Sequence, residues 1–326
     1  MKKVVLSAAA LMCGAVTFAQ TSPTENSSDV EQVGYMNEST VSQTGQNTSY
    51  VDQEFRENSV SVTQHGNNWS SIDQSGDVNA QRSSGFGNEA TVDQYGGEIA
   101  YQISDIDQEG DGNFADVDQD GQDNYSDITQ GNNQQAEDNW ATVIQNGGTM
   151  AGDGNTAVVL QRWDNNRAHV EQIGTNNSVN LEQAAAPNQS SGNWADHYQN
   201  GDNNSIVSLQ ETTQVTSIQY AGYSNGEYVR QTGDDNSSWL HQNGEGNASI
   251  VLQSDGALNQ PISSDGISNK AHVTQLGQFN GSYISQGMEG VTSDNTATVH
   301  QSGNGLNLSS ISQLGGNTAT VTQVNP

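Results

Sequence analysis

The chain has 326 residues, of which 38 are acidic and only 8 are basic, so its formal net charge is −30 at pH 7. This charge argues against nucleic-acid binding, because phosphate contacts depend on Lys and Arg side chains. Hydrophobic residues make up 31% of the chain, below the usual globular share, which argues against a conventional thick core. The residue pattern must then decide between disorder and an unusual fold.

Residues 1–19 are typical of a secretory signal peptide. Two lysines open the segment, residues 4–16 form a short apolar run, and small residues precede a cleavage site between Ala19 and Gln20. The apolar run is too short to span a membrane. Cys13, the one cysteine of the sequence, lies inside this segment, and a lipoprotein cysteine is the alternative interpretation. Without it, the mature chain has neither a disulfide nor a thiol site.

After a short N-terminal segment, residues 20–25, one repeat array occupies residues 26–326. Each unit reads Asn-x-(Ala/Ser)-x-(Val/Ile)-x-Gln, often followed by x-Gly, and 24 such units end at glutamines between Gln32 and Gln323. At the first and fifth positions of the unit few residues deviate: Gln102 and Thr213 replace the Asn, and His197, Ser208 and Ser217 replace the branched aliphatic residue. The array shows no second domain.

The spacing of two inside each unit predicts a β-strand, because alternate residues of a strand point to the same face. Asn, the small residue, the branched aliphatic residue and Gln then share one interior, and the polar residues between them face water. A helix would scatter the aliphatic residues around its surface. The predicted core includes Val41, Val117, Val143, Val170, Val273, Val299 and Val321.

Most successive glutamines lie 10 to 12 residues apart, the length of one strand and one tight turn, with Gly available for the turn. Two strands and two turns make a rung of about 22 residues, and rungs stack at roughly 4.8 Å. The predicted fold class is therefore all-β, a two-sided β-solenoid of about 12–13 rungs with amyloid-like cross-β stacking. Residues 75–87 and 254–268 are open to both a strand and a loop interpretation.

Asn and Gln side chains of neighbouring rungs are expected to stack on identical residues and form hydrogen-bonded ladders. Such ladders fix the register inside one molecule, and they could continue from one molecule to the next. The residues assigned to the ladders and to polymerisation are Asn37, Gln43, Asn47, Gln53, Asn113, Gln119, Asn124, Gln130, Asn166, Gln172, Asn236, Gln242, Asn247, Gln253, Asn295, Gln301, Asn317 and Gln323.

The unit resembles the curlin repeat of curli fibre subunits, whose pattern is Ser-x5-Gln-x-Gly-x2-Asn-x-Ala-x3-Gln. The segment from Gln108 to Gln119 matches the second half of this pattern position by position, through Gly110, Asn113 and Ala115. A similar match, with a turn one residue shorter, ends at Gln323, and most strand pairs here open with Asn where the family pattern has Ser.

This resemblance implies a functional amyloid subunit, similar to the major curlin subunit, in fibres that serve the biofilm matrix and cell adhesion. It also implies secretion to the cell surface, a nucleating subunit as partner and an outer-membrane curli secretion channel. Fibres are expected to grow at the two ends of the solenoid, because no polar cap is visible before Asn26 or after Gln323. Uncovered ends predict head-to-tail growth, a heterologous contact that produces filaments.

Acidic residues at alternate positions imitate a calcium loop, as in the run from Asp116 through Asp118 and Asp120 to Asp127. The repeat length produces the same spacing through outward-facing Asp residues, and diffuse cation binding between acidic fibres is a further interpretation. No nucleophile–base motif, phosphate loop or paired metal ligand stands out, so no enzyme activity, cofactor or metal site is predicted.

Three other functions are alternatives to a fibre subunit. A non-polymerising or nucleating surface adhesin with a β-solenoid fold is the main alternative. A β-helix enzyme acting on polysaccharide would need wide rungs and long loops, whereas these rungs are short. An ice-binding solenoid would need repeated threonine rows, and Thr318, Thr320 and Thr322 form such a row only once.

Overall fold

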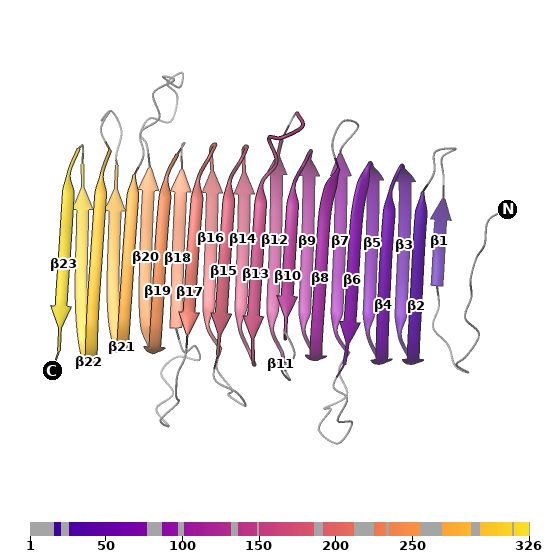
Figure 1. Cartoon of the computed structure of the whole chain (residues 1–326), viewed down its shortest axis with the longest axis horizontal. Coiled ribbons are helices and arrows are strands. Elements are labelled where there is room, and N and C mark those ends of the chain that lie inside the picture. Colours follow the sequence, from indigo (N-terminus) through magenta and orange to yellow (C-terminus); the bar gives the residue numbers. More distant parts are fainter. Residues whose placement is uncertain are drawn as a thin grey trace.

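The computed structural model describes residues 16–20, 26–76, 87–96, 101–131, 136–148, 150–185, 192–211, 225–232, 235–254, 269–287, 294–314 and 316–325. Within these residues the secondary structure is β-strand joined by turns, and each strand pairing is parallel. The strands lie side by side along one long axis, with β1 and β23 at opposite ends (Figure 1). This arrangement is the predicted β-solenoid.

The strands form two stacks that face each other across a thin core, and the chain alternates between them. The first stack contains β2 (Ser27–Tyr35), β4 (Thr48–Arg56), β6 (Asn68–Ser75), β8 (Gln102–Asp111), β10 (Tyr125–Gln130), β13 (Thr156–Arg162), β15 (Ser178–Ala184), β17 (Ser205–Glu211), β19 (Ser237–Glu245), the first halves of β21 (Lys270–Gln286) and β22 (Thr296–Gln313), and β23 (Thr318–Val324).

The second stack contains β1 (Val16–Gln20), β3 (Glu38–Gly45), β5 (Ser59–Gly66), β7 (Glu89–Gly96), β9 (Phe114–Gly121), β12 (Trp140–Gly147), β14 (Arg167–Ile173), β16 (Trp194–Asn200), β18 (Asn225–Thr232), β20 (Asn247–Ser254) and the second halves of β21 and β22. The short strand β11 (Ala136–Glu137) pairs with the end of β8 at a corner. Strands of the two stacks run in opposite directions (Figure 1).

The repeats stay in phase along both stacks. Gln43 lies opposite Gln64 and Val41 opposite Val62, and the same positions align from strand to strand. Long connections do not shift this register, since β17 pairs with β19 and β18 with β20. The unit from Thr213 to Gln219 lies outside the described residues, as do most of residues 75–87 and 254–268, so their strand or loop state stays open.

The core is one layer of small and branched side chains from each stack. Burial alternates along the strands as the spacing predicts, and Val62, Val92 and Val117 are fully buried within one hydrophobic cluster. Alanines such as Ala115 and Ala141 occupy the small position, which keeps the two stacks close together. A thin core therefore suffices for a chain with few apolar residues.

The corners depend on glycine because the turns stack as closely as the strands. Gly96 has φ +134°, and a Cβ added there would lie 2.0 Å from the carbonyl oxygen of Gly121 in the next rung. Gly121 meets Gly147 in the same way, at 1.9 Å. A column of corner glycines thus runs beside the glutamine column.

Candidate functional site: the amide ladders and edge strands

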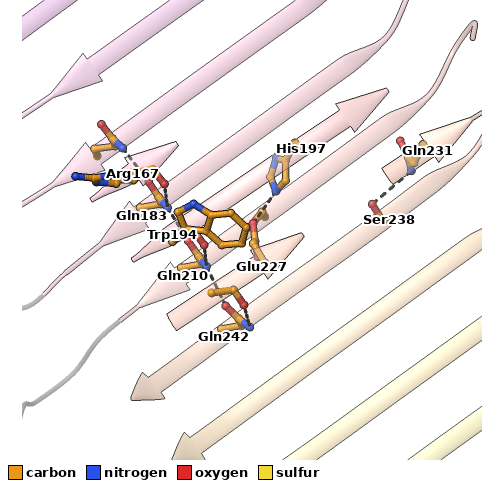
Figure 2. Close-up of polar contacts among 12 residues, drawn as sticks. Arg167, Gln183, Trp194, His197, Gln210, Glu227, Gln231, Ser238 and Gln242 are labelled. Atoms are coloured by element: carbon orange, nitrogen blue, oxygen red, sulfur yellow. Dashed lines mark hydrogen bonds and ion pairs between the residues drawn. The ribbon is translucent and has the colours of Figure 1, made fainter. Parts of the chain in front are cut away.

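A column of glutamine side chains runs through each stack. In the first stack Gln183 Nε2 donates to Gln210 Oε1 at 2.8 Å, and Gln210 Nε2 donates to Gln242 Oε1 at 3.0 Å (Figure 2). Gln183 Nε2 also donates across the core to the carbonyl oxygen of Arg167 at 3.0 Å. Each amide group therefore links its own stack along the axis and joins the two stacks to each other.

The glutamine columns are unbroken among the described residues. The first stack has twelve members: Gln32, Gln53, Gln74, Gln108, Gln130, Gln161, Gln183, Gln210, Gln242, Gln275, Gln301 and Gln323. The second has eleven: Gln43, Gln64, Gln94, Gln119, Gln145, Gln172, Gln199, Gln231, Gln253, Gln286 and Gln313.

Asparagine columns run beside the glutamine columns with the opposite polarity. The backbone N–H of Asn166 and its Nδ2 both donate to Asn139 Oδ1, at 2.9 and 3.0 Å. Asn166 Nδ2 also donates to the carbonyl oxygen of Arg162 at 2.9 Å, which closes the corner. The column of the second stack is continuous from Asn37 to Asn307. The column of the first stack is interrupted at Gln102.

Sixteen of the eighteen residues assigned to the ladders from sequence are buried: Asn37, Gln43, Asn47, Gln53, Asn113, Gln119, Asn124, Gln130, Asn166, Gln172, Asn236, Gln242, Asn247, Gln253, Asn295 and Gln301. Gln323 lies on the terminal strand β23, and Asn317, which directly precedes this strand, is exposed. Of the seven predicted core valines, Val41, Val117, Val143, Val170, Val273 and Val299 are buried, and Val321 is partly buried.

The ladder polarity makes the two ends of the solenoid different. Each Gln Nε2 donates toward the C-terminal end, as Gln32 does to Gln53 Oε1 at 2.6 Å. Each Asn donates toward the N-terminal end, as Asn47 does to Asn26 Oδ1. The N-terminal end therefore presents Gln acceptors and Asn donors, and the C-terminal end presents Gln donors and Asn acceptors. The two surfaces are complementary in hydrogen bonding.

The edge strands leave part of the core uncovered. Among the described residues, β2 pairs only with β4 and β23 pairs only with β22. Val30 on β2, and Ala319 and Val321 on β23, are only partly buried, whereas the equivalent residues inside the array are buried. Parallel strands of this kind leave their outer N–H and C=O groups available for another strand.

Strand β1 lies on the edge of the second stack, at an end of the solenoid for which the sequence predicts no cap. It pairs with β3 in the common register, with Gln20 opposite Gln43. Residues 16–19 of this strand belong to the predicted signal peptide. Removal of that segment would uncover β3.

A polar cluster interrupts the core near the middle of the array. His197 Nε2 lies 2.7 Å from Glu227 Oε1, and both side chains are fully buried (Figure 2). Ser208 Oγ also hydrogen-bonds to Glu227 Oε1. His197 Nδ1 and Glu227 Oε2 are buried without a partner. His197 and Ser208 break the repeat at its aliphatic position, but sequence reasoning missed Glu227, which replaces the usual small residue.

The outward surface carries a row of carboxylates on the first stack. Glu31, Asp52, Asp73 and Asp107 align on successive strands. Partial burial, together with the charge of Asp73, raises the pKa of Asp107 to about 6. The pKa of Asp73 is raised too, first by burial and then by Asp52 and its other acidic neighbours. In the described residues no group of His, Cys, Asp or Glu side chains is arranged to hold a metal ion, and no helix could span a membrane.

Comparison with known families agrees with the repeat geometry. Residues 105–131 and 152–184 match the family model of the curlin associated repeat. These two segments of the chain are therefore curlin associated repeats. The curlin repeat is a structural unit rather than a catalytic one. No curated protein matches the chain. The matched segments cover β9, β10, β13, β14 and β15 with part of β8, so they lie on both stacks of the same solenoid.

Proposed function

We propose that this curlin-repeat chain is a secreted structural subunit that assembles head to tail into extracellular, curli-like amyloid fibres. The complementarity of the two end surfaces supports this proposal most directly. The N-terminal end offers Gln acceptors and Asn donors, and the C-terminal end offers Gln donors and Asn acceptors. Each end also carries a partly buried core residue, Val30 at the first and Val321 at the second. A contact between unlike ends does not close on itself and so grows into a filament.

In such a fibre the solenoid would continue across each joint. The stacking of one copy on the next would add backbone hydrogen bonds, extend both amide ladders and bury the exposed core edge. The fibres would serve the biofilm matrix and cell adhesion. By family likeness, the partners would be a nucleating subunit and an outer-membrane curli secretion channel, and the first 19 residues would direct export and be removed.

The negative charge of the chain would slow assembly. Outward carboxylates such as Asp52, Asp73 and Asp107 repel their counterparts on another copy, most strongly at low ionic strength. Lowering the pH toward the raised pKa of Asp107 or adding salt would weaken this repulsion. Fibre growth should accelerate under either condition.

The test uses the chain from Gln20 onward, desalted and then incubated. We expect thin fibres by electron microscopy and a diffraction reflection near 4.8 Å along the fibre axis. Val321→Lys places a charge on the open core edge and should block growth. Val207→Lys, at an exposed valine in the middle of the array, is the matched control and should still form fibres. Persistent monomers of the parent chain would overturn the proposal and favour a non-polymerising surface adhesin.

A further inference from the structure

An odd number of repeat segments separates the two edges of the solenoid. With β1 set aside, the described chain begins with β2 and ends with β23, and both strands belong to the first stack. The first stack therefore holds one segment more than the second, as the twelve and eleven glutamines of their columns show. Connections of any length between segments leave this parity unchanged, because the chain changes stack after each segment.

A joint without rotation would leave one strand position empty. If β2 of the next copy stacked on β23, its β3 would lie two strand spacings, roughly 10 Å, beyond the second half of β22. The empty layer would leave backbone N–H and C=O groups unpaired inside the fibre. It would also leave Ile311, on the second half of β22, without a neighbour on one side.

A half turn about the long axis removes this defect. Segments of the two stacks share the Asn-to-Gln pattern and run in opposite directions (Figure 1). A half turn moves each stack to the place of the other and reverses its strands, so the strand directions match there. We propose that successive copies in the fibre are related by this half turn. The next copy's β2 then pairs with the second half of β22, and its β3 pairs with β23. This inference rests on the proposed head-to-tail assembly and on removal of β1 with the signal peptide.

The half-turn joint satisfies both end surfaces at once. Val30 of the next copy would cover Ile311, and Val41 would cover Val321, which is partly exposed in one copy alone. Gln313 Nε2, which now donates to the carbonyl oxygens of Thr296 and Asn317, would face Gln32 Oε1. The columns of both stacks would continue without a gap.

Cysteine cross-linking distinguishes the two joints. Outward residues three positions before the ladder glutamine are Asp29 on β2, Ser310 on β22 and Thr320 on β23, and all three are exposed. Neighbouring in-register positions are close enough for a disulfide. A chain starting at Gln20 has no cysteine of its own, which gives a clean background.

Fibres of the double variant Asp29→Cys/Ser310→Cys should give a ladder of disulfide-linked oligomers on a non-reducing gel after oxidation. Fibres of Asp29→Cys/Thr320→Cys should stay monomeric on the gel. Thr40→Cys/Thr320→Cys tests the second contact of the same joint and should cross-link. Thr298→Cys/Thr320→Cys, a neighbouring pair inside one copy, checks that oxidation is complete.

Cross-linking of Asp29→Cys/Thr320→Cys but not of Asp29→Cys/Ser310→Cys would overturn the half turn and show an unrotated joint. Fibres in which neither pair cross-links, although the internal pair does, would also overturn it. In both cases head-to-tail assembly can still hold. Failure of the cysteine-free chain to form fibres would instead contradict the proposed function, so the two failures are separable.

Discussion

Asn68 and Gln102 face each other on β6 and β8, and neither amide oxygen has a hydrogen-bond partner although both are buried. Every neighbouring pair in the asparagine columns is linked by donation to Oδ1, as from Asn47 to Asn26. The longer side chain of Gln102 instead turns its Nε2 to the carbonyl oxygens of Tyr95 and Gly121. One extra methylene thus breaks the ladder on both sides.

Gln102→Asn should therefore stabilise the chain. The shorter amide can donate to Asn68 Oδ1 and accept from Asn124, and each buried acceptor left unpaired costs about 1–3 kcal/mol. We expect a higher urea midpoint for the freshly desalted chain. The reciprocal change, Asn113→Gln in the continuous column of the second stack, should lower the midpoint by a comparable amount. Equal midpoints for Gln102→Asn and the parent chain would contradict this explanation.

The regular part of the structure could be predicted from the sequence because its period is local. The spacing of two places Val117 and Gln119 on one face, and the recurrence of the unit predicts that like residues stack. The polar cluster could not be predicted in full, because the contact of Glu227 with His197 and Ser208 depends on which strands become neighbours after long connections. The polarity of the ladders also needs the structure, since an amide column can point either way.

Corner glycines should be far less tolerant of substitution than other glycines. Gly96→Ala places a Cβ 2.0 Å from the backbone oxygen of Gly121, in a conformation that L side chains rarely adopt. We expect a loss of at least about 2 kcal/mol in the free energy of unfolding.

Gly226→Ala is the matched control for this corner substitution. The nearest atom to a Cβ at Gly226 is a ring carbon of Trp194 at 3.7 Å, an ordinary contact, and the backbone there carries no strain. Its urea midpoint should stay close to that of the parent chain. An equal loss in both variants would show that the stacking of corner glycines is not the cause.

The buried cluster of His197, Glu227 and Ser208 should contribute little to the net free energy of unfolding. Loss of one of its members alone should nevertheless be costly, because the others then lose their hydrogen-bond partner. Removal of one partner, as in Glu227→Ala, leaves a buried polar ring unpaired, and breaking a buried pair typically costs about 3–5 kcal/mol. The triple variant His197→Val/Ser208→Leu/Glu227→Ala restores the repeat pattern and fills the core with apolar groups.

This triple variant should be at least as stable as the parent chain, because well-packed apolar residues often replace a buried pair without loss. The stacking neighbours already have these types: Val170 and Val229 flank His197, and Ala195 lies against Glu227. Thermal melting of the parent chain, Glu227→Ala and the triple variant would rank their stabilities. A triple variant as unstable as Glu227→Ala would mean that the cluster stabilises the fold in its own right.

Stability should rise as the pH falls from 7 toward 5, because the carboxyl row on the first stack is costly to ionise. Burial raises the pKa of Asp107 to about 6 from its ordinary value of 3.8, and the pKa values of Asp73 and Asp105 are raised as well. A raised pKa means that the folded chain binds protons more tightly than the unfolded chain. Deprotonation on going to higher pH therefore destabilises the folded chain.

Asp107→Asn should flatten part of this dependence between pH 7 and 5 and raise stability at pH 7, because the amide carries no charge to be desolvated. Thr129→Asn, at the next position of the same row, removes no carboxylate and should keep the parent slope. Urea midpoints at constant ionic strength would provide the comparison. The pH dependence of stability that remains in Asp107→Asn belongs to Asp73, Asp105 and their neighbours. A pH dependence equal to that of the parent chain would show that Asp107 does not limit stability at neutral pH.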